Sequence, residues 1–235
     1  IAITCISIWD ADRFVAKAHP MTETNVPARI FARAAQDAAA AKKAVSTPQT
    51  EAASYRLAFQ DDEFLLREDL RPVRFQLELL KTEVLLDEAK IGSTIVFYGS
   101  ARIPRPGASA TAATPEIARR LEANSHYYDV SRQLAALASQ TPADENGMRQ
   151  FVVCSGGGPS IMEAANRGAA DVGAESIGLN IVLPHEQAPN CYVTPGLSFQ
   201  FHYFALRKMH FLMRARAVAV FPGGFGTFDE MFELL

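Results

Sequence analysis

Cysteine is scarce in this sequence, and the few cysteines that it has lie far apart. Cys5, Cys154 and Cys191 are odd in number and form no CxxC pair. Disulfide frameworks and zinc sites both depend on paired or closely spaced cysteines, so the sequence predicts neither. The pattern fits a protein of a reducing compartment, and we expect the cytoplasm.

The sequence also lacks a strong excess of either charge and any long apolar run. Its 23 Lys and Arg residues against 26 Asp and Glu residues give a net charge of −3, whereas nucleic-acid-binding domains usually carry a basic surface. The apolar start, Ile1 to Ile8, is too short to span a membrane and has no basic leader. We expect neither a nucleic-acid partner nor a membrane. A polar stretch begins at Met21, which we take as the natural start, with residues 1–20 as upstream sequence.

Several familiar catalytic and nucleotide-binding motifs are missing. The sequence has no G-x-x-x-x-G-K-[ST] loop and no G-x-S-x-G elbow. Its two glycine-rich loops do not fit the dinucleotide fingerprint G-x-G-x-x-G, because the third glycine position holds Ile161 in one and Asp229 in the other. These absences leave a mononucleotide binder with a different phosphate cradle.

The most informative stretch is AVAVFPGGFGTFDE, residues 217–230. It begins with five apolar residues without alternation, which predicts a strand buried on both faces. The glycines at 223, 224 and 226 have no Cβ atoms, so their backbone N–H groups can approach a ligand closely. A helix that opens at Thr227 favours an anion at its start. The stretch therefore predicts a phosphate or nucleotide site at the carboxyl end of a strand.

Glu230 also has a purely structural interpretation. Thr227-x-x-Glu230 fits a capping box, in which the glutamate side chain closes back on the start of the helix. From the residues alone this interpretation is at least as well supported as a catalytic one. A carboxylate beside a bound phosphate would also repel it, so a catalytic Glu230 must point elsewhere, for instance toward a sugar.

A second strand–glycine loop–helix unit lies earlier in the chain. A strand over residues 150–154 is followed by Ser155-Gly156-Gly157-Gly158-Pro159, and Pro159 suits the first turn of a helix. The strand over 93–100 ends in Gly99-Ser100, a turn of small residues of the kind found where a nucleotide approaches. One such loop is often only a tight turn, but two in one chain favour a ligand site. The predicted apolar face of the helix after Pro159 consists of Ile161, Met162, Ala165, Gly168, Ala169 and Val172.

Four further elements are expected. Thr114-Pro115 predicts the start of a helix that runs to about Ser139. Strands are expected over 176–183 and 198–201, and a helix from Tyr203 to about Arg216. By charge alone the cations of that last helix would form a solvated face. The side chains expected to be buried in the two helices are Tyr127, Tyr128, Leu134 and Leu137, and Phe204, Phe211, Leu212 and Ala215. His185, in the loop after the third strand, is interpreted as a loop residue that forms hydrogen bonds.

Alternating strands and helices predict an α/β fold, a Rossmann-like doubly wound parallel sheet over residues 92–235. Such a sheet normally continues with another strand and helix, so we expect this domain to be truncated at its C-terminus. Residues 1–50 are expected to form a flexible tail, in which 28–50 are either a solvated helix or a disordered arm. Residues 51–91 are expected to form a helical hairpin, with helices at 51–69 and 73–90, that serves packing or oligomer contacts.

The motif Pro222-Gly223-Gly224-x-Gly226-Thr227-x-x-Glu230 resembles the PGGxGTxxE signature of the LOG (Lonely guy) family, whose members are often mislabelled as lysine decarboxylases. The Gly99-Ser100 turn, the loop 156–158 with Met162, and Arg207-Lys208 add to the resemblance. It covers about residues 92–235, and the N-terminal hairpin resembles that of the longer bacterial members. The family hydrolyses the N-glycosidic bond of nucleoside 5′-monophosphates, AMP or cytokinin riboside 5′-monophosphates.

The resemblance implies that Arg207 and Glu230 form the catalytic pair. It implies a homodimer or a larger homo-oligomer, with no metal and no organic cofactor. Ser160 departs from the glycine expected at its position, which affects base specificity more than fold. The residues implied to bind the nucleoside monophosphate are Ser100, Gly157, Gly158, Met162, Lys208, Gly223, Gly224, Gly226 and Thr227.

Two other functions fit the same scaffold. One is a non-catalytic carrier similar to the molybdenum-cofactor carrier proteins, which share the glycine-rich signature, and the other is a nucleotide sensor. The combination of Arg207 with Glu230 favours an enzyme, because a carrier of anions has little use for that carboxylate. Lys208 has no recognisable pyridoxal-phosphate context, so the decarboxylase label is discounted.

Overall fold

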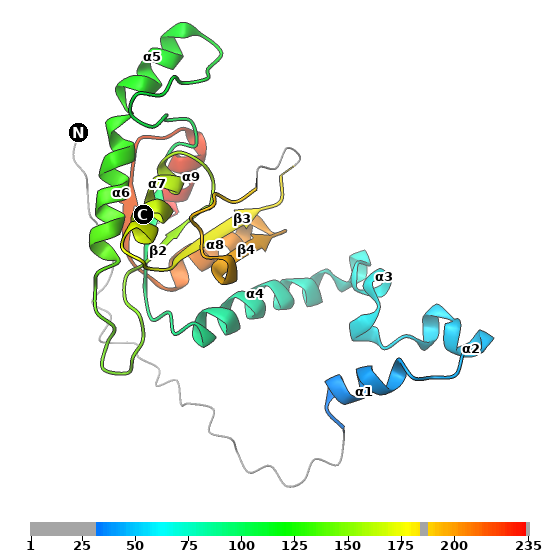
Figure 1. The fold of residues 1–235 in the computed structure, drawn as a ribbon. Helices are drawn as coiled ribbons and strands as arrows, with labels where there is room; N and C mark the ends of the chain where they lie inside the picture. Colours follow the sequence, from blue (N-terminus) through cyan, green and yellow to red (C-terminus); the bar gives the residue numbers. More distant parts are fainter. Residues whose placement is uncertain (1–31, 184–187, 234–235) are drawn as a thin grey trace. The chain divides into compact units, whose positions relative to one another are not determined.

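The computed structural model describes residues 32–183 and 188–233 (Figure 1). Contacts divide the described residues into two compact units, the first over residues 32–77 and the second over residues 78–183 and 188–233. The predictions for residues 1–31 and for His185 lie outside the described residues.

The second unit is built on a parallel sheet of five strands in the order β4-β3-β2-β1-β5. Every pair of neighbours is parallel, and β1 and β2 are buried along their whole length, as their unbroken apolar runs predict. The prediction of a doubly wound α/β fold is confirmed. The strands are β1 (Thr94–Tyr98), β2 (Val152–Ser155), β3 (Ser176–Ile181), β4 (Ser198–Phe201) and β5 (Ala215–Val220).

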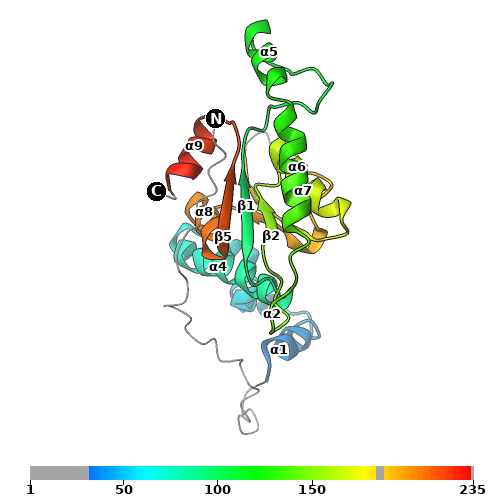
Figure 2. The same ribbon diagram turned by 90° about the vertical axis from the view of Figure 1, so that its left-hand side faces the viewer.

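Helices cover both faces of this sheet (Figure 2). Helices α6 (His126–Ala138) and α7 (Ile161–Asp171) lie on one face, and α8 (Phe204–Met213) and α9 (Phe225–Phe232) lie on the other. The core on the α7 face includes Phe97 of β1, which is fully buried. Burial of one such aromatic side chain contributes about 2 kcal/mol to stability. The sheet is therefore held rigid from both sides, which fixes the positions of the loops at its strand ends.

The prediction of one long helix from Pro115 to about Ser139 is wrong in one respect, because the structure has two helices over these residues. Helix α5 (Pro115–Ala123) begins as expected, with the Thr114 hydroxyl accepting a hydrogen bond from the backbone N–H of Ile117. Its C-cap residue is Asn124, and α6 begins at His126. Short polar side chains such as those of Asn124 and Ser125 compete with the helical backbone for hydrogen bonds, which favours a break there.

Three side chains that were predicted to be buried in helices are exposed. Leu137, Val172 and Phe204 have exposed fractions of 68%, 41% and 52%. Each lies at the end of its helix or just past it. The apolar face of a helix buries its residues only over the length that packs on the sheet, so helix ends escape burial.

Helix α4 (Arg71–Glu88) also exposes apolar side chains in its second half. Leu80 and Val84 lie four residues apart, a spacing typical of a buried stripe, but these side chains are 57% and 50% exposed, and Leu86 is buried instead. The buried side carries Glu83, which forms an ion pair of 2.8 Å with Arg214 after α8. This long-range charge pairing, which periodicity does not reveal, decides which face of α4 packs inward.

The first unit is described over residues 32–77. The helix predicted from Glu51 to Asp69 is replaced by short segments, because Tyr55, Phe59 and Leu66 remain exposed and a helix without tertiary packing is marginal. The expected hairpin is thus one long helix, α4, preceded by turns, and the division into domains stays a prediction. The segments are α1 (Ala34–Ala41), α2 (Pro48–Glu51), η2 (Ala53–Tyr55), η3 (Ala58–Gln60), α3 (Asp62–Leu65) and η4 (Glu68–Leu70).

Candidate active site

The order of the strands places the turn after β1 and the glycine loop after β5 side by side, although they are the first and the last of the glycine-containing turns that follow a strand in the sequence. Strand order reverses between β1 and β5, whose last residues, Tyr98 and Val220, are paired. In open α/β sheets ligands bind at such a switch point, outside the carboxyl ends of the strands. The backbone N–H of Ser100 donates to the carbonyl oxygen of Pro222 (3.0 Å), so the turn after β1 is tied to the loop after β5.

The glycine loop after β5 leads directly into α9, which starts earlier than predicted. Its first residue is Phe225, and Gly224 is the N-cap residue, without a side-chain cap. Thr227 therefore lies in the first turn, and the predicted capping box between Thr227 and Glu230 is wrong. The N–H groups of the first turn of a helix have no partner within the helix. They are donors that suit an anion such as a phosphate.

Arg207 and Glu230 face each other across this region. Arg207 Nη1 lies 3.4 Å from Glu230 Oε1, and the two side chains are 11% and 19% exposed. Arg207 Nε donates to the carbonyl oxygen of Leu179 at the end of β3 (2.7 Å), and its guanidinium lies over the Phe211 ring, 5.0 Å from the centroid. The Arg207 guanidinium is thus held by a backbone acceptor, an aromatic ring and a carboxylate. It does not lie on the solvated face that charge alone indicated.

Burial shifts the pKa values of both members of the pair. Burial raises the pKa of the Glu230 carboxyl above its ordinary value, and the charge of Arg207 opposes this rise. Burial lowers the pKa of the Arg207 guanidinium, and the negative charge of Glu230 opposes this fall. An arginine nevertheless keeps its charge at neutral pH. A buried carboxylate with a raised pKa beside a fixed cation is typical of catalytic sites, although structural ion pairs share these features.

The glycine loop after β2 packs against the same arginine. A Cβ atom on Gly156 would lie 2.7 Å from Arg207 Nη2 and 2.9 Å from Sδ of Met162. A Cβ on Gly158 would lie 2.7 Å from Cε of Met162. Gly157 has a positive φ of 71°, a conformation that only glycine adopts at no cost. Gly156 was missed by sequence reasoning, although its place in the Gly-Gly-Gly run was a signal.

Lys208 forms ion pairs with two exposed carboxylates, unlike the neighbouring Arg207. Its Nζ lies 2.8 Å from Oδ2 of Asp229 and 2.9 Å from Oε1 of Glu233, and these carboxylates raise the pKa of the lysine. The side chain joins α8 to α9. The structure therefore brings Lys208 to the site's border, where its charge is already paired.

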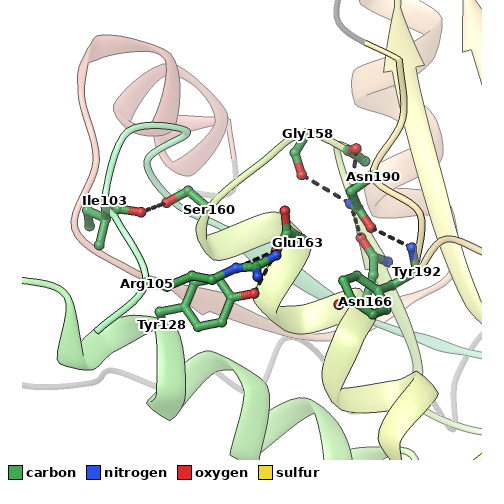
Figure 3. Close-up of polar contacts among 10 residues, drawn as sticks. Ile103, Arg105, Tyr128, Gly158, Ser160, Glu163, Asn166, Asn190 and Tyr192 are labelled. Carbon is green, nitrogen blue, oxygen red and sulfur yellow. Dashed lines mark hydrogen bonds and ion pairs between the residues drawn. The ribbon is translucent and has the colours of Figure 1, made fainter. Parts of the chain in front are cut away.

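A cavity of about 300 Å³ is lined by the loop after β1, by the end of the glycine loop after β2, and by side chains of α6 and α7. Arg102, Ser160 and Glu163 are among the residues that line it. Glu163 Oε1 accepts hydrogen bonds from Tyr128 Oη (2.7 Å) and from Arg105, as Figure 3 shows. Arg102 also approaches the loop after β5, since its Nη2 is 3.9 Å from the place of a Cβ on Gly224. Sequence reasoning left this cavity out.

Ser160, which stands where a glycine was expected, has the backbone conformation of one. Its φ is 66° and its ψ is −122°, which costs a residue with a Cβ about 1–3 kcal/mol. Its hydroxyl donates to the carbonyl oxygen of Ile103 in the loop after β1 (Figure 3). This hydrogen bond connects the glycine loop to the loop that covers the cavity.

Fold and geometry together define an α/β protein with a buried arginine–glutamate pair at the switch point of its parallel sheet. Residues 162–235 match the model of a protein family described as "possible lysine decarboxylase". The match includes the PGGxGTxxE motif, on which the resemblance to the LOG family rests, and it confirms the predicted resemblance over these residues.

Other comparisons add little. A solved structure titled as a structural-genomics target, TM1055, is similar with 21% sequence identity and a TM-score of 0.39, over 60% of this chain and 68% of that chain. The comparison with curated proteins gave no match. Within residues 32–183 and 188–233, no cluster of three or more His, Cys, Asp or Glu side chains suits a metal ion. Over the same residues, no helix has the length and apolar character needed to cross a membrane.

Proposed function

We propose that this protein hydrolyses the N-glycosidic bond of nucleoside 5′-monophosphates, with AMP or cytokinin riboside 5′-monophosphates as substrates. The observation that carries the proposal is the partly buried Arg207–Glu230 pair beside the open N-terminus of α9. A carboxylate next to an anion-binding loop is unfavourable for a phosphate alone. It is useful when the ligand also has a sugar that develops positive charge.

In this proposal the phosphate lies on the first-turn N–H groups of α9 and on Gly223, Gly224, Gly226 and Thr227. Glu230 then faces the ribose. The bond from C1′ to the base nitrogen breaks with its electron pair leaving on the base, and the oxocarbenium-like state is stabilised by the carboxylate. Water adds to C1′, its proton passes to solvent or to the base, and the products are free base and ribose 5-phosphate.

Arg207 has a supporting role in this reaction. Its charge opposes the rise in the Glu230 pKa caused by burial, and so it favours the ionised carboxylate that the reaction needs. Because Leu179 and Phe211 fix the guanidinium from two other sides, the pair is held in place before substrate binds.

The word decarboxylase in the family's description finds no support at Lys208. A lysine that forms a Schiff base must lose its proton readily, which requires a lowered pKa. Two carboxylates raise the pKa of Lys208 instead. We therefore propose that Lys208 aids substrate binding near the loop after β5 or the closure of α9 on α8, rather than amine chemistry.

We also propose that the protein forms a homodimer or a larger homo-oligomer in the cytoplasm. Three phenylalanines of α9 support this, because Phe225, Phe228 and Phe232 are 95%, 50% and 64% exposed beside the proposed site. Light scattering tests the proposal, and a monomeric mass at micromolar concentration would count against it.

The decisive experiment is incubation of the purified protein with AMP and with isopentenyladenosine 5′-monophosphate, followed by chromatography of free base and ribose 5-phosphate. Adenosine, which lacks the phosphate, should be a far poorer substrate. Glu230→Gln should reduce kcat by about 10²–10⁴ while AMP binding persists. Glu116→Gln, an exposed glutamate of α5 with a side chain 74% exposed, is the matched control and should remain active.

The outcomes separate the alternatives. AMP binding by calorimetry without release of base would favour the carrier or sensor. Full activity in Glu230→Gln would exclude Glu230 from the reaction. Carbon dioxide release from lysine would contradict the proposal altogether.

A further inference from the structure

Asn190 and Asn166 close a ring of hydrogen bonds around the glycine loop after β2, and Figure 3 shows the bonds of Asn190 to Gly158, Asn166 and Tyr192. The backbone N–H of Gly157 donates to Oγ of Ser155 (3.0 Å), and that hydroxyl donates to Oδ1 of Asn166 (2.8 Å). The same oxygen accepts from Nδ2 of Asn190 (2.9 Å). Nδ2 of Asn190 also donates to the carbonyl oxygens of Gly157 and Gly158, both at 3.0 Å. The two hydrogens of this amide are thus shared among three acceptors.

The ring is anchored in the core of the protein. Ser155 and Asn166 are fully buried, and Nδ2 of Asn166 donates to Oγ of Ser176 at the start of β3 (3.0 Å). Asn190 is held from its own side as well, because its Oδ1 accepts from the backbone N–H of Tyr192 (3.1 Å). Its backbone N–H donates to the Gly157 carbonyl oxygen (2.8 Å). A buried polar network with its members satisfied is rigid.

This arrangement determines which backbone atoms of the loop are turned toward Asn190. Both carbonyl oxygens, of Gly157 and Gly158, point to it. In a trans peptide the N–H is directed opposite to the C=O, so the N–H of Gly158 points away from Asn190. Pro159 has no N–H. The loop therefore keeps its acceptors on the side of Asn190 and a donor on the other side.

We propose that Asn190 is a positioning residue that holds the carbonyl oxygens of Gly157 and Gly158 away from the nucleotide. Without it, glycine residues have the freedom to rotate these carbonyls, and an oxygen turned toward the ligand would repel its phosphate or ribose oxygens. Asn190 acts through the loop and touches no substrate atom. This inference rests on the proposed function, since it assigns the loop to the same nucleotide site.

The test compares Asn190→Asp with the wild type. The aspartate has the same shape but places a carboxylate oxygen among three acceptors in place of the Nδ2 donor. We expect KM for AMP to rise about tenfold or more, equivalent to the loss of about 1.4 kcal/mol of binding, with kcat changed less than about threefold. At pH 5 the protonated aspartic acid regains a donor, so the ratio of variant to wild-type KM should fall. Asn190→Ala should raise KM at every pH alike.

Two controls separate positioning from general loss of stability. Ser93→Ala removes a buried hydroxyl that donates to Gln150 Oε1 (2.6 Å) before β1, at the opposite edge of the sheet. It should lower stability without changing KM. Asn146→Asp introduces the same charge at an exposed turn and should show no pH-dependent KM ratio.

Calorimetric binding of AMP to the wild type is measured first. If the wild type neither binds nor cleaves AMP, the proposed function fails and the positioning role fails with it. If the wild type binds AMP and Asn190→Asp retains an unchanged KM or Kd, only the positioning role is overturned. It is overturned equally if Ser93→Ala, at matched loss of stability, raises KM as much.

Discussion

Gly223 and Thr227 are packed so closely that no side chain fits between them. A Cβ atom on Gly223 would lie 2.5 Å from Cβ of Thr227 and closer still to its hydroxyl. Gly223→Ala should therefore displace the first turn of α9. We expect the free energy of unfolding to fall by about 1–3 kcal/mol and the affinity for AMP to fall more than about tenfold. Urea denaturation and calorimetry measure the two effects.

The control for this variant is Gly196→Ala, where no atom lies within 4 Å of the added Cβ. Stability and AMP affinity should be close to those of the wild type. Gly223→Ala with wild-type affinity would show that the loop after β5 does not need its close packing on Thr227.

The carboxyl group of Glu230 should titrate at higher pH than an ordinary glutamate, because burial raises its pKa. Carbon-13 NMR, with Glu230→Gln to assign the resonance, should give a midpoint above that of an ordinary glutamate. Activity requires the ionised form and should fall as pH falls through this midpoint. Since Arg207 lowers the same pKa, Arg207→Gln should move the midpoint higher still. A midpoint below that of a free glutamate would contradict the site as described.

Glu83 should behave in the opposite way. His210, whose Nδ1 is 3.3 Å from Oε1, and Arg214 lower the pKa of Glu83 from 4.5 to about 2. A depressed pKa contributes stability above the unfolded value, and that stability is lost as pH falls through the folded value. Glu83→Gln should be less stable than the wild type by up to about 3 kcal/mol at pH 6. The difference should shrink between about pH 5 and pH 2.

Denaturant titrations at several pH values test this expectation. Glu88→Gln, which removes an exposed carboxylate from the same helix, should show no such pH dependence. A constant difference for Glu83→Gln down to pH 2 would mean that the ion pair does not contribute.

Ser160 combines a strained backbone with a hydrogen bond, and two substitutions separate these effects. Ser160→Ala keeps the positive φ of 66° and loses the bond to Ile103, so it should be about 1 kcal/mol less stable than the wild type. Ser160→Gly loses the same bond but relieves the strain, and should be about 1–3 kcal/mol more stable than Ser160→Ala. Thermal and urea denaturation measure both. Equal stability of the two variants would show that the conformation carries no strain.

Strands β1 and β2 could be predicted from the sequence because each is a short, mostly apolar run that small residues follow. The strand expected over 198–201 is β4 with the same bounds, and the turn at Gly99-Ser100 does end β1. The proximity of Arg207 and Glu230 followed from the family motif. Their burial did not, because charge patterning alone places a cation such as Arg207 on a solvated face.

What the sequence could not show are contacts between distant residues. Arg214 selects the buried face of α4 by pairing with Glu83 and Asp87, and no local pattern contains this information. Likewise, Asn190 had no signal of its own, because its partners Gly157 and Asn166 lie far away in the chain. The capping box at Thr227 was excluded only by where α9 begins, because the N-cap is Gly224 and not Thr227.

The position of β1 between β2 and β5 has a consequence for synthesis of the chain. Tyr98 of β1 is paired with Val220 of β5, which leaves the ribosome roughly 120 residues later, several seconds at common elongation rates. Until then one edge of an apolar strand has no partner, and such edges invite association between nascent chains. From the strand order that creates the switch point we therefore also expect slow folding and a benefit from chaperones during synthesis.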